Sequence, residues 1–434
     1  MKGTLAELDC YQPHDSVLPL AYQGPLARHA EAGDRRLYHL AFHLSPAAHD
    51  LWNFLLTEET RLQAARAQGT FLVGAMKDLG TIPILVHALP QATAFYPDGA
   101  WWLPCFKEGQ TRLMEVADAQ GATEGFCPVR AMLGAFELKC HFPIPDALIC
   151  STGATCDDFK ALVQRLVERG HAVEYWEIPH MRTAEAGEAA TRLPSGRCVP
   201  TVLVDVIASE LARLWSLLQQ RTGVQADSQA LSRSIACTNR IRALLQRIRQ
   251  SGWPALEKLI CEMMALHFCS DRALCEAVLE RVAAEAAATP QDDVGVPLYW
   301  INPVADVRAM NVLESVGGRL AGSDFMFGHA LDPIDATMPP LRALACMAAD
   351  DPMAGPIGTR MHRAVAEAHR VGAKGIVVSR IPGASHCPYE AISARRVSDL
   401  PVLEIEVDSL VDAYSPALLT RMQAFVEHGL TSIS

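Results

Sequence analysis

The sequence contains no run of about 18 uncharged apolar residues, the length that a helix needs to cross a bilayer. Residues 1–15 carry acidic residues where a secretory signal peptide has its apolar stretch. Basic residues are also in the minority, since 38 Lys and Arg against 49 Asp and Glu give a net charge of -11. A surface of that sign repels polyanions. We therefore expect a cytoplasmic protein with neither a membrane nor a nucleic-acid partner.

Several catalytic motifs are absent as well. The sequence has no GxxxxGK[ST], which excludes a P-loop for ATP, and no GxGxxG, HExxH or GxSxG. No two cysteines form a CxxC pair, which excludes zinc ribbons and ferredoxin-type iron–sulfur runs. Any metal site would have to be assembled from distant parts of the chain.

The residues that are present are typical of a large globular protein. The chain has 434 residues, of which 50% are hydrophobic and 20% charged, enough for two or three domains. Strand patterns of five to seven residues alternate with helical patterns within residues 142–178 and again after residue 291, which indicates parallel sheets wrapped by helices. We predict an α/β protein with two doubly wound parallel-sheet domains and an intervening helical segment. The predicted division is 1–105 (N-terminal mixed helical region), 106–200 (first α/β domain), 201–290 (helical segment) and 291–434 (second α/β domain).

The helical segment carries an arginine-rich stretch, formed by Arg233, Arg240, Arg242, Arg247 and Arg249. A solvated helix face is the simpler interpretation of such a pattern. The alternative is contact with the phosphates of an anionic ligand.

Thirteen cysteines are spread over the chain. An odd number of cysteines in a protein expected to be cytoplasmic argues against a disulfide framework. Some of these thiols could instead bind a metal or take part in redox chemistry. Free cysteine is also one of the most buried residue types, so any single one is more often part of a core.

Three cysteines share a particular setting. Cys156 and Cys387 each open a predicted helix just after a strand, beyond the carboxyl end where open α/β sheets bind ligands. Cys127 is followed at once by Pro128, a first-turn residue. A helix N-terminus stabilises a thiolate, the form of cysteine that ligates iron. These three side chains could hold three irons of a [4Fe–4S] cluster and leave the fourth open, or each could be a small residue packed beneath a loop.

The other cysteines lack this setting. Cys261, Cys269 and Cys275 lie on an apolar helical stretch and are expected in the core, and Cys150 ends an apolar run and should point into its sheet.

The order of several short segments resembles that of the 2-hydroxyacyl-CoA dehydratase and benzoyl-CoA reductase family from about residue 105 to residue 434. The most specific pieces are Cys-Pro-x-Arg at Cys127, Thr-Cys-Asp at Cys156 with Lys160 four positions on, and the segment around Cys387. The matching segments are residues 125–134, 145–162, 300–325, 374–380, 385–390, 400–408 and 418–427.

This resemblance implies a catalytic iron–sulfur subunit. Its [4Fe–4S] cluster would be held by Cys127, Cys156 and Cys387, and its partners would be a sister subunit of the same family, a separate ATP-hydrolysing iron–sulfur activator and an acyl-CoA substrate. The implied reaction is one-electron reduction of the thioester carbonyl to a ketyl radical, leading to dehydration or to ring reduction. The resemblance leaves the catalytic side chains unassigned.

Two side chains near the presumed ligands could tune such a cluster. Arg130 and His386 are candidates for hydrogen bonding there, against the alternatives of a surface cap and an ordinary loop histidine. Two other functions stay open: a non-catalytic iron–sulfur electron-transfer paralogue, and a metal-free α/β protein that binds a small molecule and buries its thiols.

Overall fold

The structure is a computed structural model, and it describes most of the chain. The backbone alone is described at residues 100, 101, 387, 388 and 429–431. The described residues are 2–12, 14–33, 35–76, 80–101, 112–153, 156–267, 269–290, 294–302, 308–324, 331–381, 383–384, 387–406 and 416–431.

The first of two four-stranded sheets is entirely parallel and has the strand order β4-β3-β5-β6. Its strands are β3 (Phe71–Met76), β4 (Ala92–Phe95), β5 (Ala147–Gly153) and β6 (Val173–Ile178). Its helices are α5 (Ile82–Val86), α7 (Arg112–Ala119), α8 (Ala131–Leu138), α9 (Asp157–Glu168) and α10 (Thr201–Thr222), with 3-10 turns η3 (Pro97–Trp101) and η5 (Pro128–Arg130). The hairpin β7 (Ala190–Arg192) and β8 (Cys198–Pro200) leads into α10.

Both faces of this sheet are buried, because helices cover each of them, and successive side chains of a strand therefore enter two different cores. On β5, Leu148 and Cys150 join the core that contains residues of α7, α8 and α9. Ile149 points the other way, into the core that contains residues of α5, α10 and α15 (Pro340–Asp350).

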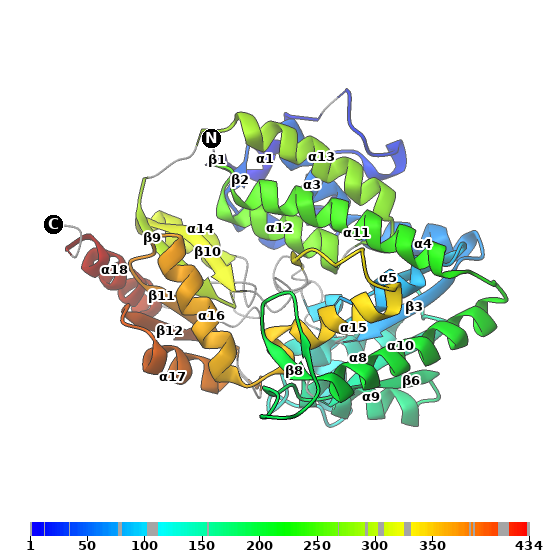
Figure 1. The fold of residues 1–434 in the computed structure, drawn as a ribbon. Coiled ribbons are helices and arrows are strands. Elements are labelled where there is room, and N and C mark those ends of the chain that lie inside the picture. The colour runs from blue at the N-terminus through cyan, green and yellow to red at the C-terminus, as the bar shows by residue number, and fades with distance from the viewer. Residues whose placement is uncertain are drawn as a thin grey trace.

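The second sheet repeats the same plan, with the parallel order β10-β9-β11-β12 (Figure 1). Its strands are β9 (Val296–Ile301), β10 (Gly318–Asp324), β11 (Ile376–Arg380) and β12 (Val402–Glu406). Its helices are α14 (Arg308–Ser315), α16 (Ile357–Arg370), α17 (Cys387–Val397) and α18 (Pro416–Thr431), and the 3-10 turn η8 (Pro352–Ala354) precedes α16. Helix α15, which comes between α14 and η8 in the chain, packs on α10 beside the first sheet.

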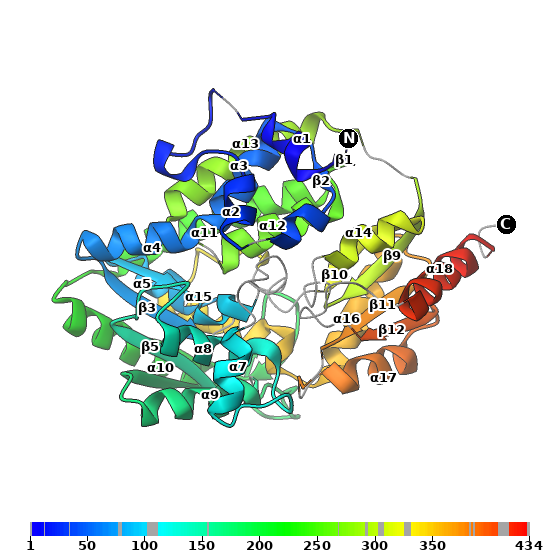
Figure 2. The ribbon, with the colours of Figure 1, turned by 180° about the vertical axis from the view of Figure 1, so that it is seen from behind.

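A helical layer lies across the top of both sheets in Figure 1 and is seen from behind in Figure 2. It combines α11 (Ser228–Arg249), α12 (Ala255–Leu266) and α13 (Arg272–Ala288) with the N-terminal elements. Asp227 and Asp271 cap α11 and α13 by accepting hydrogen bonds from backbone N–H groups of the first turn. The N-terminal elements are β1 (Lys2–Gly3), α1 (Leu5–Asp9), η1 (Leu20–Tyr22), α2 (Ala27–Glu31), η2 (Arg35–His39), β2 (Phe42–His43), α3 (Pro46–Leu56) and α4 (Glu58–Ala67).

The predicted fold class, two doubly wound parallel sheets with an intervening helical segment, is confirmed. The domain division stays a prediction. The first sheet takes β3 and β4 from residues that precede the predicted range 106–200. None of the described helices is long and apolar enough to span a membrane.

Candidate functional site

The candidate site lies where each sheet reverses its strand order. In the first sheet the order reverses between β3 and β5, and in the second between β9 and β11. The carboxyl ends of the strands beside such a switch point form the crevice where open α/β sheets bind ligands. Cys156 follows β5 and Cys387 follows β11, so the two cysteines occupy topologically equivalent positions in the two sheets.

Cys156 is the N-cap of α9 and is partly buried. The chain leaves β5 at Gly153, whose φ of +80° is in the left-handed region, and a Cβ there would overlap the carbonyl oxygen of Ile178. Lys160, one turn into α9, donates from Nζ to the Gly153 carbonyl at 3.1 Å and pairs with Asp157 at 2.7 Å. These contacts connect the end of the strand to the first turn of the helix that Cys156 caps.

Cys127 is buried, with 6% of its surface exposed, and is the N-cap of η5, which continues into α8. Arg130 supports this turn. Its guanidinium donates to the carbonyl of Phe126 at 3.0 Å and to Asp118 at 3.2 Å, and its backbone N–H donates to the Cys127 carbonyl at 3.0 Å. Arg130 is itself buried, so it is not a surface cap, and it holds the peptide that precedes Cys127.

The loop between β11 and α17 touches the Cys127 segment directly. Gly383, in that loop, has a φ of +75°, and a Cβ there would overlap the Phe126 carbonyl oxygen and lie 3.0 Å from the Cys127 nitrogen. Only glycine fits such a close approach of two backbones. The structure therefore joins the loop that leads to Cys387 with the turn that carries Cys127.

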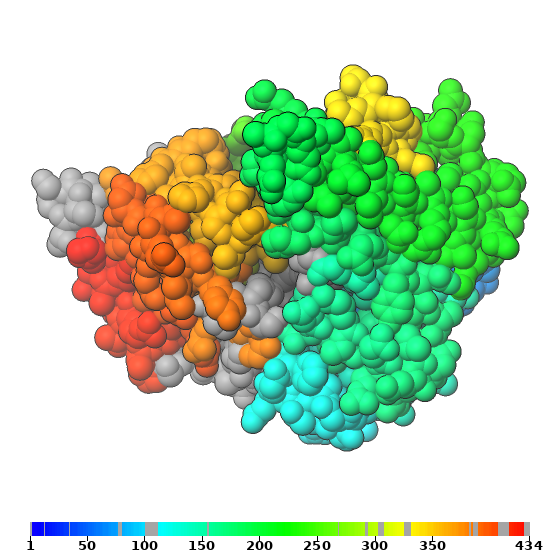
Figure 3. Space-filling view, turned by 60° about the horizontal axis from the view of Figure 1, so that its bottom comes forward, coloured from blue at the N-terminus to red at the C-terminus, as the bar shows by residue number. Residues whose placement is uncertain are grey.

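Cys127, Ile381 and Ala384 belong to one large hydrophobic core that extends from α1 to α18, and Cys156 packs against that core. Seen from below, the units around the two sheets, cyan to green and orange to red, face each other across the middle of the molecule (Figure 3).

A buried network of charged side chains anchors α17. Arg360 on α16 donates to Asp324 at 2.8 Å, to Asn302 at 3.2 Å and to Glu390, and Asn302 also donates to Glu390. Asp324 ends β10, Asn302 follows β9, and Glu390 lies in the first turn of α17, three residues after Cys387. The network thus connects the start of α17 to the carboxyl edge of its sheet.

The electrostatics of this network follow from its burial. Burial raises the pKa of Glu390, and the charge of Arg360 opposes that shift. Burial alone would lower the pKa of Arg360, but the charges of Asp324 and Glu390 together raise it above its ordinary value. Each group therefore depends on its partners to remain charged in the interior.

The sequence analysis did not identify this network. The available signal was that Asn302 and Asp324 stand where two neighbouring strands end, with Glu390 one turn after a candidate ligand.

The structure describes the three predicted ligands to different extents. The side chains of Cys127 and Cys156 are described, whereas for Cys387 the backbone alone is, and His386 lies outside the described residues. Within the described part of the chain, no three His, Cys, Asp or Glu side chains form a group that could hold a metal ion. The convergence of the three sulfur atoms stays a prediction.

The donor chemistry fits an iron–sulfur cluster, because all three cysteines stand at helix N-termini that favour thiolate. Cys261 and Cys275 are core residues of α12 and α13. Burial raises the pKa of the Cys261 thiol. The pKa of the Cys275 thiol is raised mainly by its hydrogen bond with Cys269 and, second, by burial. Both thiols stay protonated in the core.

Comparison with known proteins gives one family. The family model described as 2-hydroxyglutaryl-CoA dehydratase, D-component, matches residues 86–428 and confirms the resemblance seen in the sequence. No curated protein matches the chain.

Proposed function

Because the chain belongs to the family of the 2-hydroxyglutaryl-CoA dehydratase D-component, we propose that it is a catalytic [4Fe–4S] subunit acting on an acyl-CoA. Cys127, Cys156 and Cys387 would hold the cluster. The observation that carries the proposal is the contact of Gly383 with the Phe126–Cys127 peptide. This contact brings the loop before one proposed ligand onto the backbone of another, although the two lie in different α/β units.

The chain's own groups would prepare the site. Arg130 holds the peptide before Cys127, Lys160 connects the end of β5 to the helix that Cys156 caps, and the Arg360 network holds the helix that Cys387 opens. Burial around Cys127 would exclude water from the cluster. When bound, a cluster of this type supplies one electron at low potential to the thioester carbonyl, the reduction that would give a ketyl radical.

The proposed partners follow from the family and from the missing ATP motif. A separate ATP-hydrolysing iron–sulfur activator would deliver the electron, and a sister subunit of the same family would complete the enzyme. We propose that the protein works in the cytoplasm and carries out either dehydration or ring reduction.

Anaerobic reconstitution tests this function. The wild-type chain should take up about four irons and four sulfides, and each of Cys127→Ala, Cys156→Ala and Cys387→Ala should lose the cluster's visible absorbance and its electron paramagnetic resonance signal. Cys346→Ala is a matched control, because Cys346 is buried in α15 and has no place in the proposed ligand set. Variants that keep the chromophore would contradict the ligand assignment.

Addition of an acyl-CoA separates a catalytic subunit from an electron-transfer one. In a catalytic subunit the thioester should shift the resonance signal of the reduced cluster. An unchanged signal, together with no acyl-CoA binding by calorimetry, would instead support the electron-transfer paralogue.

A further inference from the structure

Two cysteine side chains are in contact at the start of α13. Cys275, on α13, is 0% exposed, whereas Cys269, in the connection between α12 and α13, is only partly buried. The two thiols are joined by a hydrogen bond. The sequence analysis expected Cys269 in the core together with Cys275, but the structure places it at the edge, packed against the core. The pair therefore combines one thiol that solvent can reach with one that it cannot.

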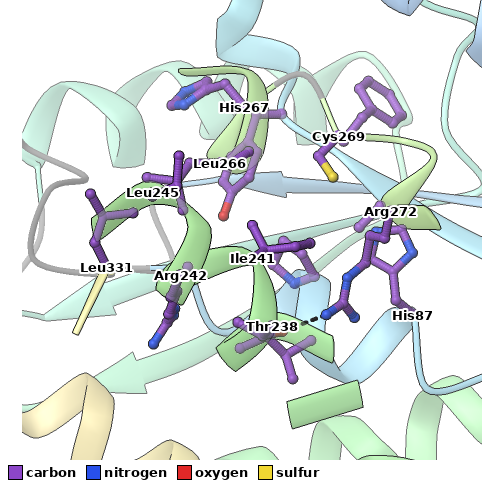
Figure 4. A pocket seen from close by; sticks show the side chains of 17 residues that line it. His87, Thr238, Ile241, Arg242, Leu245, Leu266, His267, Cys269, Arg272 and Leu331 are labelled. Atoms are coloured by element: carbon purple, nitrogen blue, oxygen red, sulfur yellow. Dashed lines mark hydrogen bonds between the residues drawn. The ribbon is translucent and has the colours of Figure 1, made fainter. Parts of the chain in front are cut away.

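Cys269 also lines a pocket between the helical layer and the first sheet, together with His267 and Arg272, which stand on either side of it in the chain (Figure 4). The other walls come from α5, the end of β4 and α11, and the pocket is partly open to solvent. Cys275 does not line it. A small molecule that enters this pocket therefore meets Cys269 and not its partner.

The turn between the two cysteines is held by hydrogen bonds on all sides. The backbone N–H and the hydroxyl of Ser270 donate to the two carboxylate oxygens of Glu58 at 3.0 and 2.9 Å. The Ser270 carbonyl accepts a hydrogen bond from the Thr93 hydroxyl at 2.6 Å. Asp271 caps α13 through its side chain, and its carbonyl accepts from the backbone N–H of Cys275 at 3.0 Å. The backbone on both sides of the thiol pair is therefore fixed, which preserves the contact between the two sulfur atoms.

The ionisation of the pair gives its two members different roles. The hydrogen bond with Cys269 raises the pKa of the Cys275 thiol, and burial and the charge of Cys269 raise it further, whereas the charges of Arg61 and Arg272 oppose the shift. Cys275 therefore keeps its proton after Cys269 has lost its own. Because the thiolate is the reactive form of cysteine, Cys269 is the thiol that attacks first.

We propose that Cys269 and Cys275 form a reversible oxidation site, at which a peroxide converts the two thiols into a disulfide that closes the α12–α13 connection. An accessible cysteine beside a second, resolving cysteine is the usual arrangement of such sites. Hydrogen peroxide suits the position because it is hardly larger than water. A peptide disulfide would have to bring its own sulfur atom into line with the partly buried Cys269 sulfur.

The reaction has two steps. The Cys269 thiolate attacks one oxygen of hydrogen peroxide, the O–O bond breaks, and Cys269 becomes a sulfenic acid while the other oxygen takes up a proton and leaves as water. The Cys275 sulfur then attacks the Cys269 sulfur, the S–O bond breaks, and a disulfide and a second water form. The two thiols lose two electrons and two protons, and one peroxide is reduced to two waters.

Mass spectrometry of the full-length chain tests this site. The chain is treated with hydrogen peroxide under argon, its remaining thiols are alkylated, and it is digested with trypsin. Because Arg272 lies between the two cysteines, the disulfide should appear as two tryptic peptides joined through Cys269 and Cys275, and dithiothreitol should separate them. Fragmentation distinguishes Cys269 from Cys261, which lies in the same peptide. Glutathione disulfide should instead modify the exposed Cys198 in preference to Cys269.

Variants separate the roles of the two thiols. In Cys275→Ala, peroxide should leave a sulfenic acid on Cys269 that dimedone traps, whereas in Cys269→Ser the buried Cys275 should stay reduced. Cys237→Ser is the matched control and should form the link as the wild type does, because the Cys237 thiol donates to Glu276 at 3.6 Å and has no part in the pair.

The wild-type digest decides the proposal even where a variant does not fold. A reduced Cys269 after peroxide treatment, a sulfinic acid on Cys269 without the link, or a link from Cys269 to another cysteine would overturn it. Preferential formation of the link by glutathione disulfide would overturn the assignment of a peroxide. Chains with and without iron should form the link equally, so the result is independent of the cluster assignment.

Discussion

The two sheets share one strand order, yet they fix their proposed ligands in different ways. In the first unit, α9 is attached to the end of β5 by Lys160, a partly exposed side chain that bonds a backbone carbonyl and a neighbouring aspartate. In the second, α17 is attached through Arg360, Asp324, Asn302 and Glu390, all buried. The topology thus brings both cysteines to the same kind of edge, whereas the strength of each attachment depends on local chemistry.

Breaking the buried network should have the largest effect. Arg360→Met leaves Asp324 and Glu390 without their cation, and removal of one partner of a buried ion pair costs about 3–5 kcal/mol. Urea unfolding of the chain should show this loss, with a lower iron content after reconstitution. Arg395→Met is the control, because Arg395 forms an exposed pair with Glu404 and its loss should cost less than about 1 kcal/mol. Equal effects of the two variants would refute the proposed anchoring.

The next largest effect is expected from disturbing the contact between Gly383 and the Phe126 carbonyl, which joins the two α/β units. Gly383→Ala places a methyl group against the Phe126 carbonyl and strains a backbone with positive φ, a cost of about 1–3 kcal/mol. We expect less iron per chain than in the wild type and a weaker resonance signal. Gly372→Ala is the matched control, because Gly372 also has a positive φ but a Cβ there meets no atom within 4 Å. If both variants bind iron equally, the contact does not support the site.

Arg130 should have a local effect that changes the cluster's properties but not its iron content. Arg130→Met removes the hydrogen bond to the Phe126 carbonyl while keeping an apolar side chain of similar length, and a charged hydrogen bond of this kind contributes about 1.5–3 kcal/mol. The expected readout is a shifted cluster potential or altered resonance line shape with the iron retained. Arg130→Lys should bring the cluster potential and the resonance line shape part of the way back to those of the wild type. An unchanged spectrum would leave Arg130 with a role in folding only.

Much of the second unit could be predicted from the sequence, because its strands are short apolar runs separated by clear helix signals. The predicted alternation of strands and helices after residue 291 agrees with β9 to β12 and the helices between them, and the helix predicted to open at Cys387 agrees with α17. β3 and β4 were missed. β3 is buried on both faces and shows no alternation, and β4 has only four residues, so neither differs locally from a buried helix segment.

The candidate site was predictable only in part. Cys156 and Cys387 could be placed because a cysteine after a strand and before a helix has a recognisable local pattern. The contact of Gly383 with Phe126 and the Arg360 network depend on segments far apart in the chain, and no local pattern specifies such pairs. The burial of Arg242 could not be predicted either. The five arginines of the arginine-rich stretch in α11 resemble a solvated helix face in the sequence, and the pattern does not show that one of them points inward.

The smallest effect is expected at Lys160. Lys160→Met removes the bond to the Gly153 carbonyl and the pair with Asp157, but both are solvated, so the free energy of unfolding should fall by about 1 kcal/mol or less. Thermal unfolding with and without 0.5 M salt measures it, because salt screens an exposed pair and should remove the difference between variant and wild type. A loss as large as that of Arg360→Met would show that α9 depends on a charge contact as strongly as α17 does, and the contrast between the two units would fail.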